Sequence, residues 1–222
     1  MQRIIIIGNS GAARECYELL QLVMVLNPTC MTTIAFKGFL SHKGYAGNLG
    51  QLAHMQIGSD EDYVPQSEDA FVIGIADPAL RRECFMEVQT KGGRLFNLIS
   101  PWGGLSQDTT LGEGNIIGHG CAFSCNVRLG DGNYLNGGIR LGHDAIIGDF
   151  NFLGPETILL GGASVGSGNQ IGVRSVLIER CRVGNNNRIA PGSFVYKGCG
   201  DKRILAGNPA LSIDGPPEEQ KD

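Results

Sequence analysis

Large apolar residues recur every six positions through the C-terminal half of the chain. From Ile99 to Val195, all seventeen positions at this spacing are large and apolar, with no gap or phase slip. A helix would repeat apolar residues at a period of about 3.6, and a flat strand at a period of two. A six-residue period therefore predicts a unit that combines one short strand with one turn.

The residues around the repeated position support this interpretation. Glycine follows the large apolar residue in nine of the seventeen units, where it allows the backbone geometry that turns need. The fourth residue after the large apolar one is mostly small, as at Cys121, Ala163 and Ser175. We expect the large and the small residue both to point inward and to fill the interior together.

Three consecutive units contain eighteen residues, and we expect them to form one triangular coil of the chain. Such coils stack at about the 4.8 Å spacing of neighbouring strands, so residue n+18 lies directly above residue n. Each coil covers the sheet edge of the next, and only the two ends of the column need a cap. The repeat thus predicts a parallel β-helix over residues 99–213.

The first 98 residues follow a different pattern, in which strands alternate with helices. The expected strands are Arg3–Ile7, Thr33–Leu40, Ala70–Ala76 and Arg94–Ile99. The expected helices are Ala12–Leu26 and one from Asp77 through Val88. Such alternation is typical of a small parallel sheet with crossover helices. We expect an α/β, Rossmann-like domain over residues 1–98, and a disordered tail over residues 214–222.

Composition and charge argue against several classes of protein. The chain has 222 residues, of which 42% are hydrophobic and 18% are charged, so it can bury a core. A net charge of −4 argues against a nucleic-acid partner. The longest apolar run near the start, Ile4–Ile7, is too short for a signal peptide or a membrane span. We therefore expect a cytoplasmic protein.

Seven cysteines without a secretion signal predict reduced thiols. His119, Cys121 and Cys125 are close enough in sequence to suggest a metal site. However, Cys121 falls at the small inward position of the repeat, as do Cys181 and Cys199, and there cysteine packs as a small hydrophobe. We interpret the cluster as core packing and expect no metal site.

The repeat contains two histidines, and both fall two positions after the inward apolar residue, so both are expected to point outward. His119 and His143 are 24 residues apart, which is one coil plus one unit and places them on different faces of one prism. We interpret His119 as a solvated surface residue. His143 is followed by Asp144 and comes seven residues after Asn136. A carboxylate beside an imidazole raises its basicity and fixes its orientation.

The turn Gly8-Asn9-Ser10-Gly11 lies between the first predicted strand and the first predicted helix. Free backbone N–H groups at such a helix N-terminus attract phosphate. The spacing is not GxGxxG, and a tight strand–helix turn needs small residues for packing alone. Nucleotide binding and plain packing are therefore equal interpretations of this turn.

Several segments together resemble the bacterial nucleotide-sugar N-acetyltransferases. They are the unbroken hexapeptides, Gly8–Gly11, Phe71–Arg81, Leu135-Asn136 with His143-Asp144, Ile147–Phe150 and Ala206–Ala210. The similar members acetylate the amino group of a UDP-4-amino-4,6-dideoxy sugar or a relative, and sialic-acid-cluster O-acetyltransferases look alike. The resemblance covers nearly the whole chain. It implies a left-handed β-helix, a homotrimer, and acetyl-CoA as co-substrate.

The resemblance implies a role for each matched residue of the acyl site. His143 matches the catalytic base, Asp144 matches the acid that tunes it, and Asn136 matches a residue that places the reacting groups. Gly161, eighteen residues beyond His143, matches the glycine whose backbone N–H faces the thioester oxygen. A donor at that place can stabilise an oxyanion.

The resemblance also implies where the two substrates bind. Acetyl-CoA is implied to lie in the groove between two prisms of a trimer, in contact with Gly161, Val173, Pro191 and Lys197. Lys197 and Arg203 are candidate phosphate partners, and solvated surface cations are an equal interpretation. The nucleotide-sugar site is implied to include Gly8, Ser10, Gly11, Ala12, Ser41, His42 and Ala76.

The chain departs from the family pattern where nucleotide recognition is implied. Ala12 stands where many relatives have a histidine after the glycine turn, and Ser41-His42 stands where relatives often have two acids. Pro191 and Phe152 replace residues that commonly contact CoA. A nucleotide other than UDP, or a different sugar, is therefore compatible with this sequence.

The expected function is acetyl transfer from acetyl-CoA to the amine of a nucleotide-linked amino-deoxy sugar, for bacterial surface glycan biosynthesis. An O-acetyltransferase acting on a sugar or sialic-acid hydroxyl and a non-catalytic trimeric nucleotide-binding scaffold are the alternatives. A zinc enzyme of the γ-carbonic anhydrase type needs three histidines, and the repeat has two. A dinucleotide oxidoreductase needs an acid after the second strand, which this chain lacks.

Overall fold

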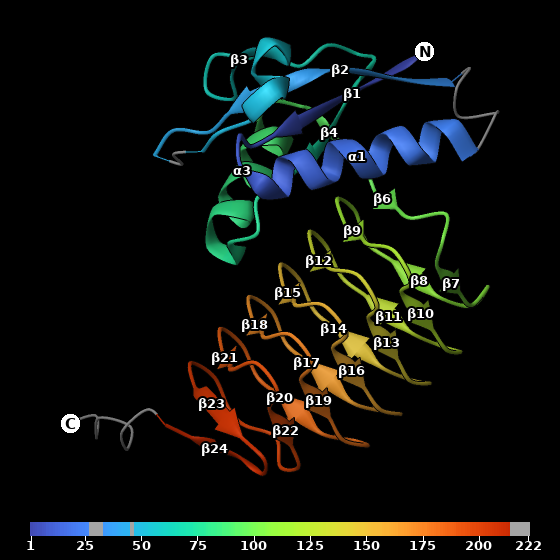
Figure 1. The fold of residues 1–222 in the computed structure, drawn as a ribbon, viewed down its shortest axis with the longest axis vertical. Helices are drawn as coiled ribbons and strands as arrows, with labels where there is room; N and C mark the ends of the chain where they lie inside the picture. The colour runs from blue at the N-terminus through green and yellow to red at the C-terminus, as the bar shows by residue number, and fades with distance from the viewer. Residues whose placement is uncertain (27–32, 45–46, 214–222) are drawn as a thin grey trace.

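The chain folds into a small sheet domain followed by a long column of stacked coils (Figure 1). The computed structural model describes residues 1–26, 33–44 and 47–213, so the expected disordered tail lies outside the described residues. The predicted fold class is confirmed: a Rossmann-like parallel sheet precedes a left-handed parallel β-helix. No helix in the described ranges is long and apolar enough to span a membrane.

Five parallel strands form the N-terminal sheet, and helices pack on both of its faces. Its elements are β1 (Gln2–Ile7), α1 (Gly11–Leu26), β2 (Ile34–Ser41), the 3-10 helix η1 (Gly50–Met55), β3 (Gln56–Ser59), β4 (Asp69–Ile73), α3 (Pro78–Thr90) and β5 (Arg94–Leu95). The strand order is β3-β2-β1-β4-β5. Side chains of β1 alternate between two cores: Ile4 and Ile6 pack on the α1 side, and Ile5 and Ile7 pack on the α3 side.

The structure corrects the N-terminal prediction in two places. The run Arg94–Ile99, predicted as one strand, is two strands in different sheets, because β5 pairs with β4 while β6 (Leu98–Ile99) begins the coils. The N–H of Phe96 still bonds to the sheet, and the N–H of Leu98 already bonds to the coils. The elements η1 and β3 were not predicted, since residues 50–59 contain no run of β-branched or aromatic residues.

Seventeen two-residue strands, β6 to β22, form the coils, and each ends on one of the predicted apolar positions. After β6 they are β7 (Gly104–Leu105), β8 (Thr110–Leu111), β9 (Ile116–Ile117), β10 (Ala122–Phe123), β11 (Arg128–Leu129), β12 (Tyr134–Leu135), β13 (Arg140–Leu141), β14 (Ile146–Ile147), β15 (Phe152–Leu153), β16 (Ile158–Leu159), β17 (Ser164–Val165), β18 (Gln170–Ile171), β19 (Val176–Leu177), β20 (Arg182–Val183), β21 (Arg188–Ile189) and β22 (Phe194–Val195). The antiparallel pair β23 (Ile204–Gly207) and β24 (Ala210–Ser212) closes the far end.

The coils form three sheets, one for each side of the prism. Sheet B contains every third strand from β6, sheet C every third strand from β7, and sheet D every third strand from β8. Strands one coil apart pair in parallel with a register of eighteen residues, as between Arg140 and Ile158. The predicted position of residue n+18 above residue n is therefore confirmed.

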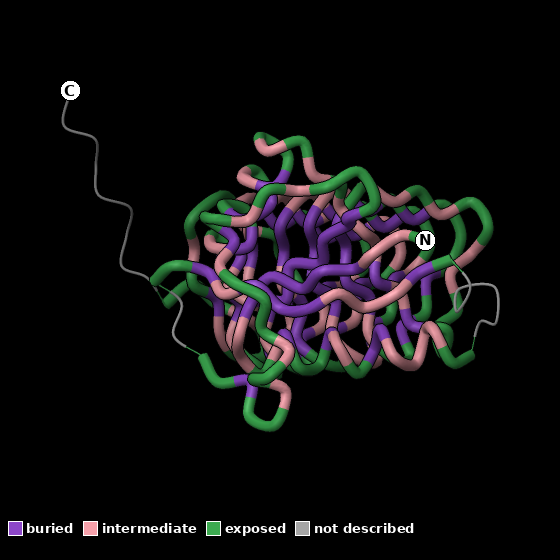
Figure 2. The backbone as a smooth tube through the Cα atoms, turned by 90° about the horizontal axis from the view of Figure 1, so that it is seen from above, coloured by how far each residue is buried: buried purple, intermediate pink, exposed green. Residues whose placement is uncertain are grey.

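Buried residues run through the interior of both parts of the molecule (Figure 2). In the prism, the predicted inward cysteines pack against the aliphatic core: Cys121 and Cys181 are buried and Cys199 is half-buried. Six cysteines lie in the described part of the chain, and all six are free. The interpretation of Cys121 as core packing is therefore confirmed.

A column of buried asparagines links successive coils inside the prism. The Nδ2 of Asn151 donates to the Oδ1 of Asn133 at 3.0 Å, and the backbone N–H of Asn151 donates to the same oxygen at 2.9 Å. The same pair of bonds recurs at each eighteen-residue step. The column consists of Asn115, Asn133, Asn151, Asn169 and Asn187, all of which are buried.

One buried arginine joins the sheet domain to the coils. Arg81 of α3 is fully buried and donates to the carbonyls of Ile75 and Ala76 in the sheet domain at 2.9 and 2.8 Å. It also donates to the carbonyls of Gly132 and Asn151 in the coils at 2.7 and 2.8 Å. Burial lowers the pKa of Arg81 to about 10, so its guanidinium is charged at neutral pH. These bonds fix the sheet domain at one angle to the prism.

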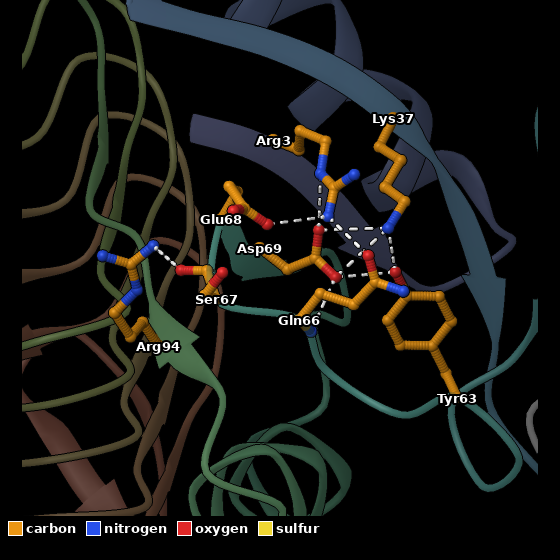
Figure 3. Close-up of polar contacts among 8 residues, drawn as sticks. All are labelled: Arg3, Lys37, Tyr63, Gln66, Ser67, Glu68, Asp69 and Arg94. Carbon is orange, nitrogen blue, oxygen red and sulfur yellow. Dashed lines mark hydrogen bonds and ion pairs between the residues drawn. The ribbon is translucent and has the colours of Figure 1, made fainter. Parts of the chain in front are cut away.

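A buried carboxylate anchors the start of β4 to its neighbours (Figure 3). Asp69 accepts hydrogen bonds from Arg3 at 3.0 Å, Lys37 at 3.1 Å, the hydroxyl of Tyr63 at 2.7 Å and the backbone N–H of Gln66 at 3.0 Å. Burial by itself raises the pKa of Asp69, but these donors outweigh it and leave the pKa below its ordinary value. The ionised carboxylate therefore stabilises the fold.

We predict that Asp69→Asn lowers the free energy of unfolding by about 2–3 kcal/mol at neutral pH, since charged hydrogen bonds are lost. The folded-state pKa lies below the unfolded one, so this stabilisation is complete above the unfolded pKa and disappears as pH falls through the folded pKa. Urea denaturation at several pH values checks this. The gap between wild type and variant should shrink on acidification, whereas a constant gap would contradict the account. Glu83→Gln, at an exposed position of α3 outside this cluster, is the control.

Candidate active site

His143 and Asp144 form a hydrogen-bonded pair on the turn that follows β13. The Nδ1 of His143 lies 2.8 Å from the Oδ2 of Asp144, and Asn126 donates to the other oxygen of Asp144 at 2.6 Å. A carboxylate only accepts, so Nδ1 carries a hydrogen, and in the neutral ring the lone pair is on Nε2. Hydrogen bonds from His143 and Asn126 hold the pKa of Asp144 below its ordinary value. The imidazole is 59% exposed in the single chain.

Gly161 lies against the ring of His143, one coil further along the column. The carbonyl of His143 accepts from the N–H of Gly162 at 2.7 Å, which fixes the two turns on each other. A Cβ on Gly161 would overlap the imidazole, with Cε1 only 2.6 Å away. The φ of Gly161 is not in the positive region, so the space and not the backbone demands glycine here.

The predicted acyl-site residues divide between two corners of the prism. The turns between sheets C and D, called here the His143 corner, carry His143, Gly161 and Lys197. The turns between sheets B and C, called the Asn136 corner, carry Asn136, Val173 and Pro191. One chain therefore brings His143, Asp144 and Gly161 together, and it holds Asn136 at the opposite edge of sheet C. Arg203 directly precedes β23 of sheet B and lies at neither corner.

A cavity of about 580 Å³ opens between α1 and the Asn136 corner. Its coil side is formed by Asn136, Tyr134 and His119. The Oδ1 of Asn136 accepts from the N–H of Gly137 at 2.8 Å. His119 is exposed, as predicted, and its Nδ1 lies 2.8 Å from the hydroxyl of Ser100. The cavity therefore combines apolar walls with several fixed polar groups, as small-molecule sites do.

The helix side of this cavity was missed by the sequence reasoning. Arg14, Glu15 and Glu18 of α1 line it, and the hydroxyl of Tyr134 donates to Glu15 at 3.1 Å. A signal was present in the sequence: Gly11, Arg14, Glu15 and Glu18 follow the spacing of one helix face. The surface that faces these polar residues is set by the packing of α1 on the coils. The local sequence of the helix does not indicate this packing.

The residues expected to bind the nucleotide sugar are scattered. Of these, Gly11 lines the cavity beside α1, and Ala76 lines a separate cavity of about 420 Å³ with Phe152. Gly8 has a φ of +128° and packs on Gly74, where a Cβ would lie 2.7 Å from the carbonyl oxygen. Close packing against Gly74 therefore explains why residue 8 is a glycine. Ser10 and Ala12 are half-buried at the start of α1.

The pair Ser41-His42 lies at the carboxyl edge of β2. The hydroxyl of Ser41 donates to the carbonyl of Gly58 at 3.3 Å. His42 is only 7% exposed, and its Nδ1 lies 2.7 Å from Asp60. The structure therefore turns His42 inward, beneath α3, rather than toward a cavity.

The fold of the chain is similar to that of one class of solved structures. The chain has the architecture of the nucleotide-sugar N-acetyltransferases built on a left-handed β-helix, as the sequence resemblance implied. Its sequence matches no protein-family model and no curated protein. The class is therefore defined by similarity to solved structures.

Three solved structures show this similarity over nearly the whole chain. A histidine-to-asparagine mutant of perosamine N-acetyltransferase from Caulobacter crescentus, in complex with CoA and GDP-perosamine, is 26% identical with a TM-score of 0.84, and 97% of this chain covers 98% of that one. The acetyltransferase domain of PglB from Neisseria gonorrhoeae, with acetyl coenzyme A, has 18% identity and a TM-score of 0.83 (96% and 99% covered). WeeI from Acinetobacter baumannii has 21% identity and a TM-score of 0.79 (96% and 100% covered).

We predict that Gly161→Ala displaces the imidazole of His143, because the new Cβ occupies the space of the ring. The ring must then leave Asp144, and Nδ1 loses its carboxylate partner. The ¹⁵N chemical shifts of the imidazole report this: wild type should hold a single tautomer with hydrogen on Nδ1, and the variant a mixture. Gly104→Ala is the matched control, since nothing lies within 4 Å of its Cβ position. Unchanged His143 shifts in Gly161→Ala would contradict the packing.

Proposed function

We propose that the protein transfers the acetyl group of acetyl-CoA to the amino group of a nucleotide-linked amino-deoxy sugar, in bacterial surface glycan biosynthesis. The observation that carries this proposal is the packing of the His143–Asp144 pair against Gly161. The solved perosamine enzyme, which is similar to this chain along its whole length, is an N-acetyltransferase with CoA and GDP-perosamine bound. That similarity favours an amine over a hydroxyl acceptor.

His143 is the proposed general base. The amine nitrogen attacks the thioester carbonyl, a tetrahedral intermediate forms, and the C–S bond breaks to release CoA. The proton of the amine moves to Nε2 of His143, which is free because Nδ1 faces Asp144. Asp144 orients the ring and stabilises the imidazolium that forms. The imidazolium then gives this proton to the departing thiolate, so the products are the N-acetylated sugar and CoA with its free thiol, and His143 is neutral again.

Gly161 is the proposed oxyanion donor. The eighteen-residue register sets its backbone beside the ring of His143, so one reacting carbonyl can lie near both groups. A backbone N–H that is already in place stabilises the negative oxygen of the intermediate without any reorganisation. The absence of a side chain at Gly161 is what lets the imidazole and the thioester approach the same backbone.

Sheet C supports a homotrimeric assembly. Its outward side chains near the far end of the column are apolar and are half-buried or exposed in the single chain: Ile158, Leu160, Val176, Ile178, Phe194 and Tyr196. The outward residues of sheet D at the same level include Ser164 and Arg182. We place sheet C against neighbouring copies around a threefold axis. The His143 corner of one copy then meets the Asn136 corner of the next.

This assembly assigns each substrate a place. Acetyl-CoA lies in the groove between the two corners, with Gly161 and Lys197 from one copy and Val173 and Pro191 from the next. The amino sugar occupies the cavity beside Asn136, where the carboxylates of Glu15 and Glu18 can accept hydrogen bonds from its polar groups. Two substrates held in one groove react as if the step were unimolecular. Free cysteines and a nucleotide-sugar acceptor support a cytoplasmic location.

We predict that His143→Asn lowers kcat by about 10²- to 10⁴-fold while CoA binds as in wild type, because only proton transfer is removed. Thiol release from acetyl-CoA, measured against a panel of nucleotide-linked amino sugars that includes GDP-perosamine, tests both the acceptor and the base. His54→Asn, on exposed η1, is the control with full activity. Turnover near the wild-type value in His143→Asn would overturn the assignment of the base.

A further inference from the structure

Three potential metal ligands meet in the sheet domain, away from the acyl site. His42 directly follows β2 and Asp60 directly follows β3, and the last residues of these two strands, Ser41 and Ser59, are paired. Both side chains therefore lie at the same carboxyl edge of the sheet. Cys84 reaches them from α3, which covers this face (Figure 1). Exposure is 7% for His42, 5% for Asp60 and 0% for Cys84.

The ligand atoms of the three residues converge on a single point. The Nδ1 of His42 lies 2.7 Å from the Oδ2 of Asp60, and the sulfur of Cys84 lies 3.8 Å from the same oxygen. All three ligand atoms lie within 4.8 Å of one another. A nitrogen, a carboxylate oxygen and a sulfur at these separations form a donor set for one ion, because each can move by less than a bond length to coordinate it.

The carboxylate of Asp60 is only half satisfied. Its second oxygen, Oδ1, is buried and has no hydrogen-bond partner among the described residues. The nearby ammonium of Lys91 donates to the backbone carbonyls of Asp60 and Glu61 and pairs with Glu87. The ammonium of Lys91 therefore bonds to groups other than the carboxylate of Asp60. A buried carboxylate with an unpaired oxygen calls for a further partner.

We propose that His42, Asp60 and Cys84 bind a divalent transition-metal ion of the zinc type. Mixed nitrogen, oxygen and sulfur ligands are typical of Zn²⁺, with roughly 2.0–2.3 Å to each ligand. An ion at these distances separates its ligands by about 3.3 Å, so the His42–Asp60 hydrogen bond opens slightly as the metal replaces its proton. Glu87, one helical turn from Cys84, lines the small cavity beside Asp60.

The site is structural and not catalytic. It is buried, and it joins the ends of β2 and β3 to α3, three segments that are far apart in the sequence. It lies directly beside Ser41, at the edge of the sheet where the resemblance implies nucleotide binding. A metal here would hold that edge rigid, and its affinity does not depend on the acyl-transfer chemistry at His143. Failure of this proposal would therefore leave the proposed function untouched.

The test uses the full chain without a histidine tag, stripped with a chelator and titrated with Co²⁺ and with Zn²⁺. Co²⁺ bound by a thiolate gives a charge-transfer band in the near ultraviolet, which reports sulfur ligation directly. We expect one Co²⁺ per chain and this band in wild type. Cys84→Ser should remove the band, and Cys16→Ser, at an equally buried cysteine with no such cluster, should keep it. Zn²⁺ should abolish the band by displacing Co²⁺.

A thermal measurement keeps the proposal falsifiable if Cys84→Ser folds poorly. Saturating Zn²⁺ should raise the Tm of wild type and Cys16→Ser, because an ion that binds only the folded state stabilises it. The shift should vanish in His42→Gln and in Asp60→Asn, with at least a tenfold loss of Zn²⁺ affinity in each. A folded wild type that shows no charge-transfer band, a band that survives in Cys84→Ser, or a Tm that Zn²⁺ leaves unchanged would each overturn the metal site.

Discussion

The rest of the structure depends on the eighteen-residue step between coils, which the buried asparagine column fixes. Each of the first four asparagines uses its side-chain oxygen to accept two N–H groups from the asparagine of the next coil, as Asn133 does from Asn151. Buried amides must be paired, so a coil that slipped by one residue would leave both partners unsatisfied. This register brings Gly161 against His143 and keeps Asn136 at the other edge of sheet C. The site geometry is therefore a consequence of packing inside the prism.

A second constraint fixes the sheet domain on this column. The guanidinium of Arg81 bonds to carbonyls on both sides of the junction. The apolar face of α1 packs on the first coils, where it contacts a core that includes Leu98 of β6 and Tyr134 of β12. These contacts hold α1 against the coils, so the cavity beside Asn136 is formed within the single chain. The polar helix face that contains Glu15 then becomes one wall of the proposed acceptor site.

The repeat predicted all seventeen coil strands, because one inward apolar residue per six is a strong local pattern. It also predicted that Gly161 stacks on His143. The repeat does not predict the asparagine column, although its eighteen-residue spacing is visible in the sequence, because asparagine at the inward position fits the pattern as one more small residue. The cavity could not be predicted, because it forms where α1 meets the coils. The resemblance implies a nucleotide-site role for His42, which stays a prediction, and its hydrogen bond to Asp60 is a contact that the sequence pattern does not predict.

The central claim is that each active site uses the His143 corner of one copy and the Asn136 corner of the next. Co-assembly of two inactive variants, His143→Asn and Asn136→Ala, tests this most directly. In mixed trimers some interfaces combine an intact His143 from one chain with an intact Asn136 from the other. We predict that activity returns to roughly a quarter of wild type at equal mixing, by random assortment around the threefold axis. Activity no greater than the average of the two variants would contradict a shared site.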